Sequence, residues 1–197
     1  MKMSVFCGTS VDGFIARPDD TLDFLEAGGG GPHGFTEFLR SVDVVVLGRR
    51  TYEVVTKIGH FGLYGKRQII VLSRTPLDLS SSKAKIEQMS GTPQEIAAQL
   101  DKRGFQHAYV DGGITIQRFL QQGLVNRITV TRVPVLIGQG IPLFGPLTKD
   151  VPVRHIKTQS YKGGLVQSEY EVGTAPRTSS RKPKAPGRAR HKKRTKR

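Results

Sequence analysis

Short apolar runs alternate with segments of helical periodicity through most of the chain. Val44-Val45-Val46-Leu47, Ile69-Ile70-Val71-Leu72 and Ala108-Tyr109-Val110 are continuously apolar and rich in β-branched residues. Such runs are typical of parallel strands that are buried on both faces. This pattern predicts strands over residues 3–10, 43–47, 68–72 and 107–110, and helices over 34–41, 50–57, 92–104 and from the Asp111-Gly112-Gly113 turn to Gly123.

The C-terminal part of the pattern differs. Residues 127–137 form a long β-rich run, 138–142 read as a loop, and 153–161 and 165–172 read as an antiparallel hairpin joined near Lys162-Gly163-Gly164. The fold class predicted is therefore α/β, with a mostly parallel, helix-flanked sheet and an antiparallel C-terminal edge. From Gly173 onward no apolar periodicity remains, so a domain over 1–172 and a disordered basic tail over 173–197 are expected.

The charge is unevenly divided along the chain. The 197 residues carry a formal net charge of +15, which by itself resembles a nucleic-acid-binding protein. Residues 173–197 hold 11 of the 31 Lys and Arg and none of the 16 Asp and Glu, which leaves 20 basic against 16 acidic side chains, a net charge of +4, for residues 1–172. The predicted domain is only mildly basic.

Several chemistries find no support in the sequence. Cys7 is the single cysteine and falls in an apolar run, so no intrachain disulfide can form and a core position is expected. The five histidines are scattered, so no metal site is predicted, and no nucleophile elbow is found. No signal peptide and no run of about 18 apolar residues occurs, which favours a soluble cytoplasmic protein without a membrane segment.

Three junctions that follow apolar strands carry the candidate chemistry. They are Gly48-Arg49-Arg50-Thr51, Leu72-Ser73-Arg74-Thr75 and Asp111-Gly112-Gly113-Ile114-Thr115. A helix N-terminus at the end of a strand offers free N–H groups to a phosphate, glycine lets the backbone approach it, and arginine adds charge. Arg74 suits a phosphate monoester, which would select NADPH over NADH. The alternative is ordinary turn chemistry and an exposed arginine.

The order of motifs resembles the dihydrofolate reductase-like superfamily, specifically the branch containing the reductase domain of the bifunctional riboflavin-biosynthesis deaminase-reductase. The resemblance covers about residues 3–172. The pieces that carry it are Ser10-Val11-Asp12-Gly13-Phe14-Ile15-Ala16, Val46-Leu47-Gly48-Arg49-Arg50-Thr51-Tyr52-Glu53, Val71-Leu72-Ser73-Arg74, Val110-Asp111-Gly112-Gly113, and Pro134 to Phe144.

This resemblance implies a dihydrofolate reductase-like three-layer fold and an NADPH-dependent reductase. A hydride would pass to a heterocyclic or ribosylamine substrate, as in a 5-amino-6-(5-phosphoribosylamino)uracil reductase. Ser73 and Arg74 would hold the 2′-phosphate, and the first and third junctions would hold the pyrophosphate and nicotinamide half. The cofactor-binding residues implied are Gly48, Arg49, Arg50, Thr51, Leu72, Ser73, Arg74, Gly112, Gly113, Ile114 and Thr115.

The substrate side departs from the family pattern. Asp111 stands where the pathway enzyme typically has Glu, and Tyr52-Glu53-Val54-Val55 replaces an Asp-x-Pro-x-Leu element, so a pterin remains an alternative substrate. Asp12 is the acid ranked first for a catalytic role, with an Asx turn as the alternative. Asp111 and Phe14 are predicted substrate contacts, although Asp111 could instead brace the Gly-Gly turn and Phe14 could be a core residue.

Two predictions concern binding partners, one for the basic tail and one for the C-terminal strands. Residues 177–197 are a candidate for non-specific contact with nucleic acid or an acidic surface, and a solvating extension is the alternative. They contain no aromatic residue for base stacking. By resemblance, a homodimer through the C-terminal strands is expected. A scaffold without reductase activity is the less favoured reading, because it would not need the phosphate contacts of Arg49, Arg74 and Gly112-Gly113.

Overall fold

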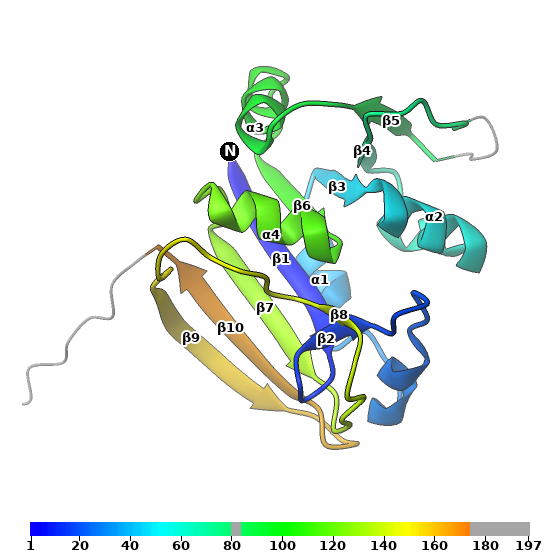
Figure 1. The fold of residues 1–197 in the computed structure, drawn as a ribbon, viewed down its shortest axis with the longest axis vertical. Helices are drawn as coiled ribbons and strands as arrows, with labels where there is room; N and C mark the ends of the chain where they lie inside the picture. Colours follow the sequence, from blue (N-terminus) through cyan, green and yellow to red (C-terminus); the bar gives the residue numbers. More distant parts are fainter. Residues whose placement is uncertain (80–83, 174–197) are drawn as a thin grey trace, which may run out of the picture.

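The computed structural model describes residues 1–79 and 84–173. Its centre is one mixed sheet made by β1 (Lys2–Thr9), β3 (Val44–Gly48), β4 (Gln68–Leu72), β5 (Ile86–Met89), β6 (His107–Asp111), β7 (Arg127–Arg132), β9 (Val153–Ser160) and β10 (Val166–Val172). The strand order is β5-β4-β3-β6-β1-β7-β10-β9 (Figure 1). The strands from β5 to β7 in this order are parallel, whereas β10 pairs antiparallel with β7 and β9. The predicted fold class is confirmed.

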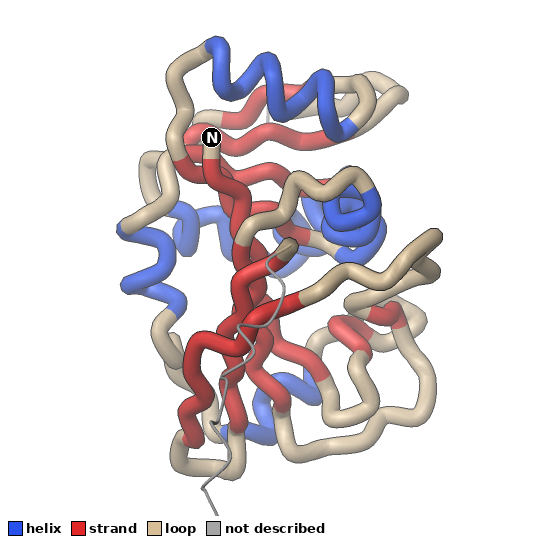
Figure 2. The backbone as a smooth tube through the Cα atoms, turned by 90° about the vertical axis from the view of Figure 1, so that its left-hand side faces the viewer, coloured by secondary structure: helices blue, strands red, loops and turns tan. Residues whose placement is uncertain are grey.

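Helices lie on both faces of this sheet (Figure 2). They are α1 (Phe35–Arg40), α2 (Arg49–Ile58), α3 (Pro93–Lys102) and α4 (Gly113–Gln121), with short 3₁₀ helices η1 (Asp23–Gly28) and η2 (His60–Tyr64). A second, two-stranded sheet pairs β2 (Phe14–Ala16) with β8 (Ile141–Pro142).

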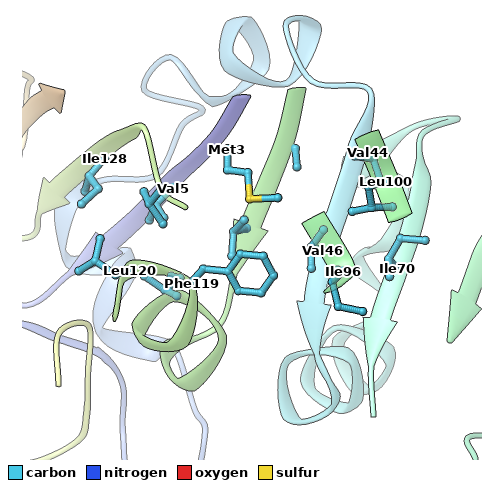
Figure 3. Packing of buried hydrophobic residues seen from close by; sticks show 14 of the residues in the cluster. Met3, Val5, Val44, Val46, Ile70, Ile96, Leu100, Phe119, Leu120 and Ile128 are labelled. Carbon is cyan, nitrogen blue, oxygen red and sulfur yellow. The ribbon is translucent and has the colours of Figure 1, made fainter. Parts of the chain in front are cut away.

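Strand β3 shows why the central runs are continuously apolar. Successive side chains of a strand point to opposite faces, so a strand covered on both sides needs apolar residues at every position. Val44 and Val46 are fully buried in the cluster formed with α3 and α4 (Figure 3). Val45 and Leu47 are fully buried in a second cluster, formed with residues of α1, α2 and η2.

Helix α3 begins as predicted. The Thr92 backbone N–H donates to Glu95 Oε2 at 2.7 Å, and the Glu95 N–H donates to Thr92 Oγ1 at 3.3 Å. This reciprocal pair is a capping box, and Pro93 occupies the first helical position, where a missing N–H costs nothing. The hydrogen bonds lower the pKa of the Glu95 carboxyl.

The predicted strand over 127–137 is too long. β7 ends at Arg132, and beyond it the Val133 N–H donates to the Thr9 carbonyl and the Val11 N–H donates to the Val135 carbonyl, both at 2.8 Å. Pro134 has no N–H to continue the ladder. The Val135 N–H donates back to the Val133 carbonyl at 2.7 Å, so the regular ladder ends there.

Other differences are local. The segment between α2 and β4 contains η2, and the expected loop over 138–142 contains β8. Strand β5 was not predicted, because Ile86-Glu87-Gln88-Met89 is short and carries two polar residues on a sheet edge. The C-terminal hairpin is confirmed as β9 and β10.

Two predictions fall partly outside this description. The tail predicted over 173–197 lies beyond the described residues from position 174 onward. Among the helices that the structure describes, none is long and apolar enough to cross a membrane.

Candidate active site

A cleft of about 1500 Å³ opens at the carboxyl edge of the parallel strands. Its walls come from the C-terminal ends of β1, β3, β4 and β6 and from the N-terminal ends of α2 and α4. This edge is where ligands bind in open α/β sheets. All three predicted junctions line the cleft, through Gly48, Arg49, Arg50, Thr51, Leu72, Ser73, Arg74, Asp111, Gly112, Gly113, Ile114 and Thr115.

The first and third junctions share the sequence Gly-x-x-Thr, and they interlock. A Cβ atom at Gly48 would lie 2.5 Å from Thr115 Oγ1, and one at Gly112 would lie even closer to Thr51 Oγ1. Gly112 also has a φ of +97°, which side chains rarely allow. The two glycines therefore bring the N-termini of α2 and α4 into contact.

These two helix starts differ from that of α3, which also borders the cleft. The first backbone N–H groups of any α-helix have no partner within the helix, and in α2 and α4 no side-chain cap accepts from them. The N–H groups at the start of α3 are satisfied by its own capping box. Anionic groups are therefore attracted to α2 and α4, where dipole and free donors coincide.

The second junction presents an arginine on a braced turn. Ser73 Oγ donates to the Thr75 carbonyl at 2.6 Å and accepts from the Thr75 N–H at 3.2 Å. Gln88 Nε2, from β5, donates to the carbonyls of Ser73 and Thr75. The Ser73 hydroxyl thus shapes the turn, and Arg74 is left exposed without an ion pair among the described residues.

The arginines of α2 are engaged differently. Arg49 pairs with Glu53 one turn along the helix, at 3.6 Å. Arg50 Nε lies 2.6 Å from Oδ1 and 2.7 Å from Oδ2 of Asp20, in the loop before η1. The Arg49–Glu53 pair is exposed to solvent on both sides, and in the second pair Arg50 is exposed while Asp20 is partly buried. Exposed pairs contribute little to stability, so these arginines can exchange their partners for a ligand phosphate.

Asp111 ends β6 on the floor of the cleft. Its Oδ1 accepts a hydrogen bond from the Gly112 N–H at 2.8 Å, and this bond braces the Gly-Gly turn. Such a brace is one of the two roles predicted for Asp111. Burial raises the pKa of this carboxyl, and it outweighs the opposing hydrogen bond from Gly112. Cys7 lines the same floor rather than lying fully in the core, and burial raises the pKa of its thiol.

The structure does not bring Asp12 and Phe14 to this cleft. The Asp12 carboxylate accepts from the N–H groups of Gly138 at 2.7 Å and Ile137 at 3.3 Å. Hydrogen bonding to Ser10, followed by these two, lowers its pKa. Asp12 therefore ties its own loop to the segment after β7, and Phe14 belongs to the small β2–β8 sheet. Neither residue lines the cleft.

Sequence reasoning missed several residues of the cleft. Arg118 lines it from α4, one turn after Ile114, so the i, i+4 spacing from a predicted site residue was the signal that could have found it. Phe6, Phe35, Tyr64 and Tyr109 line it from four separate elements. No local motif joins these four, so only the fold could bring them together.

A helix-flanked parallel sheet, with a cleft at its carboxyl edge and two uncapped helix starts facing the cleft, is the arrangement of a nucleotide-binding α/β enzyme domain. The comparison with protein families gives the particular family. Residues 2–167 match the RibD C-terminal domain, and the chain belongs to this family.

Two similar proteins span nearly the same length. A putative riboflavin biosynthesis protein from Shewanella sp. PV-4 is 34% identical, with a TM-score of 0.80, and the match covers 87% of this chain and 99% of that one. The uncharacterized protein YwjB of Bacillus subtilis is 29% identical over 86% of this chain and 97% of its own.

More distant structures share the fold. The deaminase/5-amino-6-(5-phosphoribosylamino)uracil reductase of Thermotoga maritima is 13% identical with a TM-score of 0.69, over 86% of this chain and 56% of that chain. A dihydrofolate reductase from Enterococcus faecalis, complexed with NADP(H) and RAB-propyl, is 18% identical with a TM-score of 0.59, over 87% and 94%. The fold is dihydrofolate reductase-like.

Proposed function

We propose that this chain is an NADPH-dependent reductase that transfers a hydride to a small heterocyclic or ribosylamine acceptor, the type of reaction found in riboflavin biosynthesis. The observation that carries the proposal is the interlocked pair of uncapped helix starts at Gly48 and Gly112. Together they make one anion-binding surface that suits a pyrophosphate.

The cleft also fits the rest of a dinucleotide. Arg74 lies on the turn after β4 and has no ion pair among the described residues. It would pair with the 2′-phosphate, which NADPH carries and NADH lacks. Ligand pockets commonly measure about 300–1,000 Å³. At about 1500 Å³, the cleft has room for a cofactor and a second small molecule.

Within this proposal NADPH supplies the hydride, and the protein positions the acceptor and excludes water. Asp111 is an acid that lines the cleft beside the Gly112-Gly113 turn, and burial raises the pKa of its carboxyl, so it is the candidate proton donor to the acceptor. Asp12 and Phe14 have no part in the proposal, because neither lines the cleft.

A pterin is the second candidate acceptor. The observation that favours it is the pair Phe6 and Phe35, which line the cleft and are only partly buried, because exposed aromatic rings suit a flat fused ring.

The direct test is titration of the full chain with NADPH and NADH, followed by the fluorescence of the reduced nicotinamide. Saturable binding that favours NADPH supports the proposal, and oxidation of bound NADPH on addition of an acceptor would establish the activity. Failure to bind either nucleotide would overturn it.

A further inference from the structure

His33 lines the cleft from the segment before α1, and one nitrogen of its ring has no partner. Within residues 1–79 and 84–173, His33 Nε2 is the one buried side-chain nitrogen or oxygen that makes no hydrogen bond. Buried polar atoms in folded proteins are nearly always paired, because leaving water without a replacement partner is costly. An unpaired nitrogen on a residue of the cleft wall is therefore a candidate contact for a ligand.

The rest of His33 is firmly held. Its carbonyl accepts from Gln167 Nε2 at 2.8 Å and from the Tyr161 hydroxyl at 3.4 Å. Its ring lies against the Tyr161 ring, with centroids 4.7 Å apart. Its φ of +39° is in the left-handed region, which residues with a Cβ rarely adopt unless surrounding contacts maintain it. The hairpin of β9 and β10 therefore fixes the position of this histidine.

The same glutamine holds Thr131 close to His33. Gln167 Nε2 donates to Thr131 Oγ1 at 2.8 Å as well as to the His33 carbonyl, so both of its N–H groups are used. Thr131 Oγ1 accepts in this bond, and its own proton has no acceptor among the described residues. Thr131 also lines the cleft. This part of the wall therefore contains a free hydroxyl donor and an unpaired imidazole nitrogen.

The order of the strands places this pair away from Arg74. Thr131 belongs to β7, whereas Arg74 follows β4, and β3, β6 and β1 lie between them in the sheet (Figure 1). Neighbouring strands are about 4.8 Å apart, so four spacings separate the two strands by about 19 Å. A dinucleotide that extends from Arg74 across the helix starts after β3 and β6 would leave the part of the cleft at β1 and β7 to the acceptor.

Gly31 lies over the ring of His33. A Cβ atom at Gly31 would lie 3.5 Å from both Nε2 and Cε1 of the histidine, which is an ordinary contact distance. Gly29, Gly30 and Gly31 all have positive φ, and they have no side chains to anchor them in the core. A small shift of this segment would open a path from the cleft to Nε2.

We propose that His33 binds the acceptor through Nε2 and that Thr131 provides a second hydrogen bond. The ligand chemistry that matches the pair is a cyclic amide, as in a pyrimidinone or pterin ring, whose carbonyl oxygen accepts from Thr131 and whose ring N–H donates to His33. This inference rests on the proposed function and deepens it, because it assigns recognition of the acceptor to two residues of the same cleft. Neither residue binds the cofactor.

The test uses the full chain with saturating NADP⁺, so that no turnover occurs. Isothermal titration calorimetry measures binding of 5-amino-6-(ribitylamino)uracil and of 7,8-dihydrofolate, each of which contains a cyclic amide. His33→Phe keeps a ring beside Tyr161, and His33→Asn suits the positive φ, whereas both remove the imidazole nitrogen. Each variant is expected to bind the preferred ring compound about fivefold or more weakly, the effect of a lost neutral hydrogen bond, and NADP⁺ within about twofold of the unmodified chain.

His155→Phe is the matched control. His155 also packs against a tyrosine, Tyr170, with ring centroids 5.6 Å apart, but it lies on β9 and does not line the cleft. Its replacement should change neither affinity. If the His33 variants bound the ring compound as the unmodified chain does, or lost NADP⁺ affinity to the same extent, the inference would be wrong and the proposed function would stand.

Thr131 gives an independent measurement. Thr131→Val keeps the shape of the side chain without the hydroxyl and should weaken the ring compound by about fivefold, whereas Thr131→Ser keeps the hydroxyl and should weaken it by less than about twofold. Equal losses in the two variants would contradict the role assigned to Thr131.

The remaining outcomes separate this inference from the proposed function. If NADP⁺ binds and neither ring compound does, the cyclic amide is the wrong ligand class, and the cofactor half of the proposed function stands. If NADP⁺ itself does not bind, the proposed function fails and the inference fails with it.

Discussion

The hydroxyl of Thr51 fills the space that a side chain at position 112 would need. This contact joins the first turn of α2 to the turn that precedes α4, and Thr115 and Gly48 make the reciprocal contact. The geometry of the anion-binding surface therefore depends on two glycines and two threonines rather than on any charged group.

Gly112→Ala is expected to lower the free energy of unfolding by about 2 kcal/mol or more. Overpacking costs about 1–3 kcal/mol, and a left-handed backbone costs a residue with a Cβ about 1–2 kcal/mol. The variant should also bind NADPH at least about tenfold more weakly, since the helix starts must separate. The measurements are urea denaturation and nucleotide titration.

Gly104→Ala is the matched control for this variant. Gly104 has a φ of +87°, and nothing lies within 4 Å of the site of a new Cβ atom. It should show only the backbone cost, about 1 kcal/mol, with unchanged NADPH affinity. Equal losses in the two variants would mean that the contact between Thr51 and Gly112 has no role.

Arg74→Ala should weaken NADPH binding by about 10- to 100-fold, because a hydrogen bond to a charged group contributes about 1.5–3 kcal/mol. NADH has no 2′-phosphate, so its affinity should change by less than about twofold. Fluorescence titration with both nucleotides measures the difference. Arg40→Ala, an exposed residue of α1 that does not line the cleft, is the control. If NADH lost as much affinity as NADPH, the phosphate role of Arg74 would be wrong.

Asp111→Asn should stabilise the protein at neutral pH relative to the natural chain. The carboxyl ionises near pH 3.9 in the unfolded chain, whereas burial raises its pKa in the folded state. The folded state is therefore penalised increasingly as the pH rises through the folded pKa, and the penalty is absent below the unfolded pKa. Asparagine keeps an oxygen that can accept from the Gly112 N–H.

Urea denaturation of both proteins between about pH 4 and 8 tests this prediction. The stability difference should grow with pH. Glu37→Gln, which removes an exposed carboxylate from α1, controls for the change in net charge. A difference for Asp111→Asn that stayed constant with pH would contradict the argument.

A chain that ends at Gly173 should keep its NADPH affinity within about twofold. The last strand is completed by the Val172 N–H, which donates to the Asn126 carbonyl, and the Gly173 N–H, which donates to the Pro152 carbonyl, both at 2.9 Å. Of the two readings of the tail, contact with nucleic acid or an acidic surface requires that the full chain alone binds, with an affinity that falls steeply with salt, whereas a solvating extension requires that neither chain binds. A large loss of NADPH affinity in the shorter chain would show that the last residues contribute to the cleft.

Local patterns were sufficient where one segment decides its own structure. The apolar run at Val44 to Leu47 predicted β3, and the Thr92–Glu95 spacing predicted the start of α3. The Gly-x-x-Thr junctions predicted one wall of the cleft for the same reason, since a helix start after a buried strand has a fixed direction.

Residues whose position depends on distant segments could not be predicted in this way. Asp12 follows β1 in sequence, but the chain after β7 folds back and supplies the N–H groups that engage its carboxylate. The aromatic residues that line the cleft likewise need β1, α1, η2 and β6 in their final places. The arrangement of these four elements is a property of the sheet order, which no single run of residues contains.

The interlocked junctions also constrain how this sequence can change over time. An enlarged side chain at position 48 can be accommodated only if the residue at position 115 becomes smaller, whereas position 112 also needs glycine for its positive φ. Among related chains, positions 48 and 115 are therefore expected to vary together, although they are more than sixty residues apart in the sequence, and position 112 is expected to stay glycine.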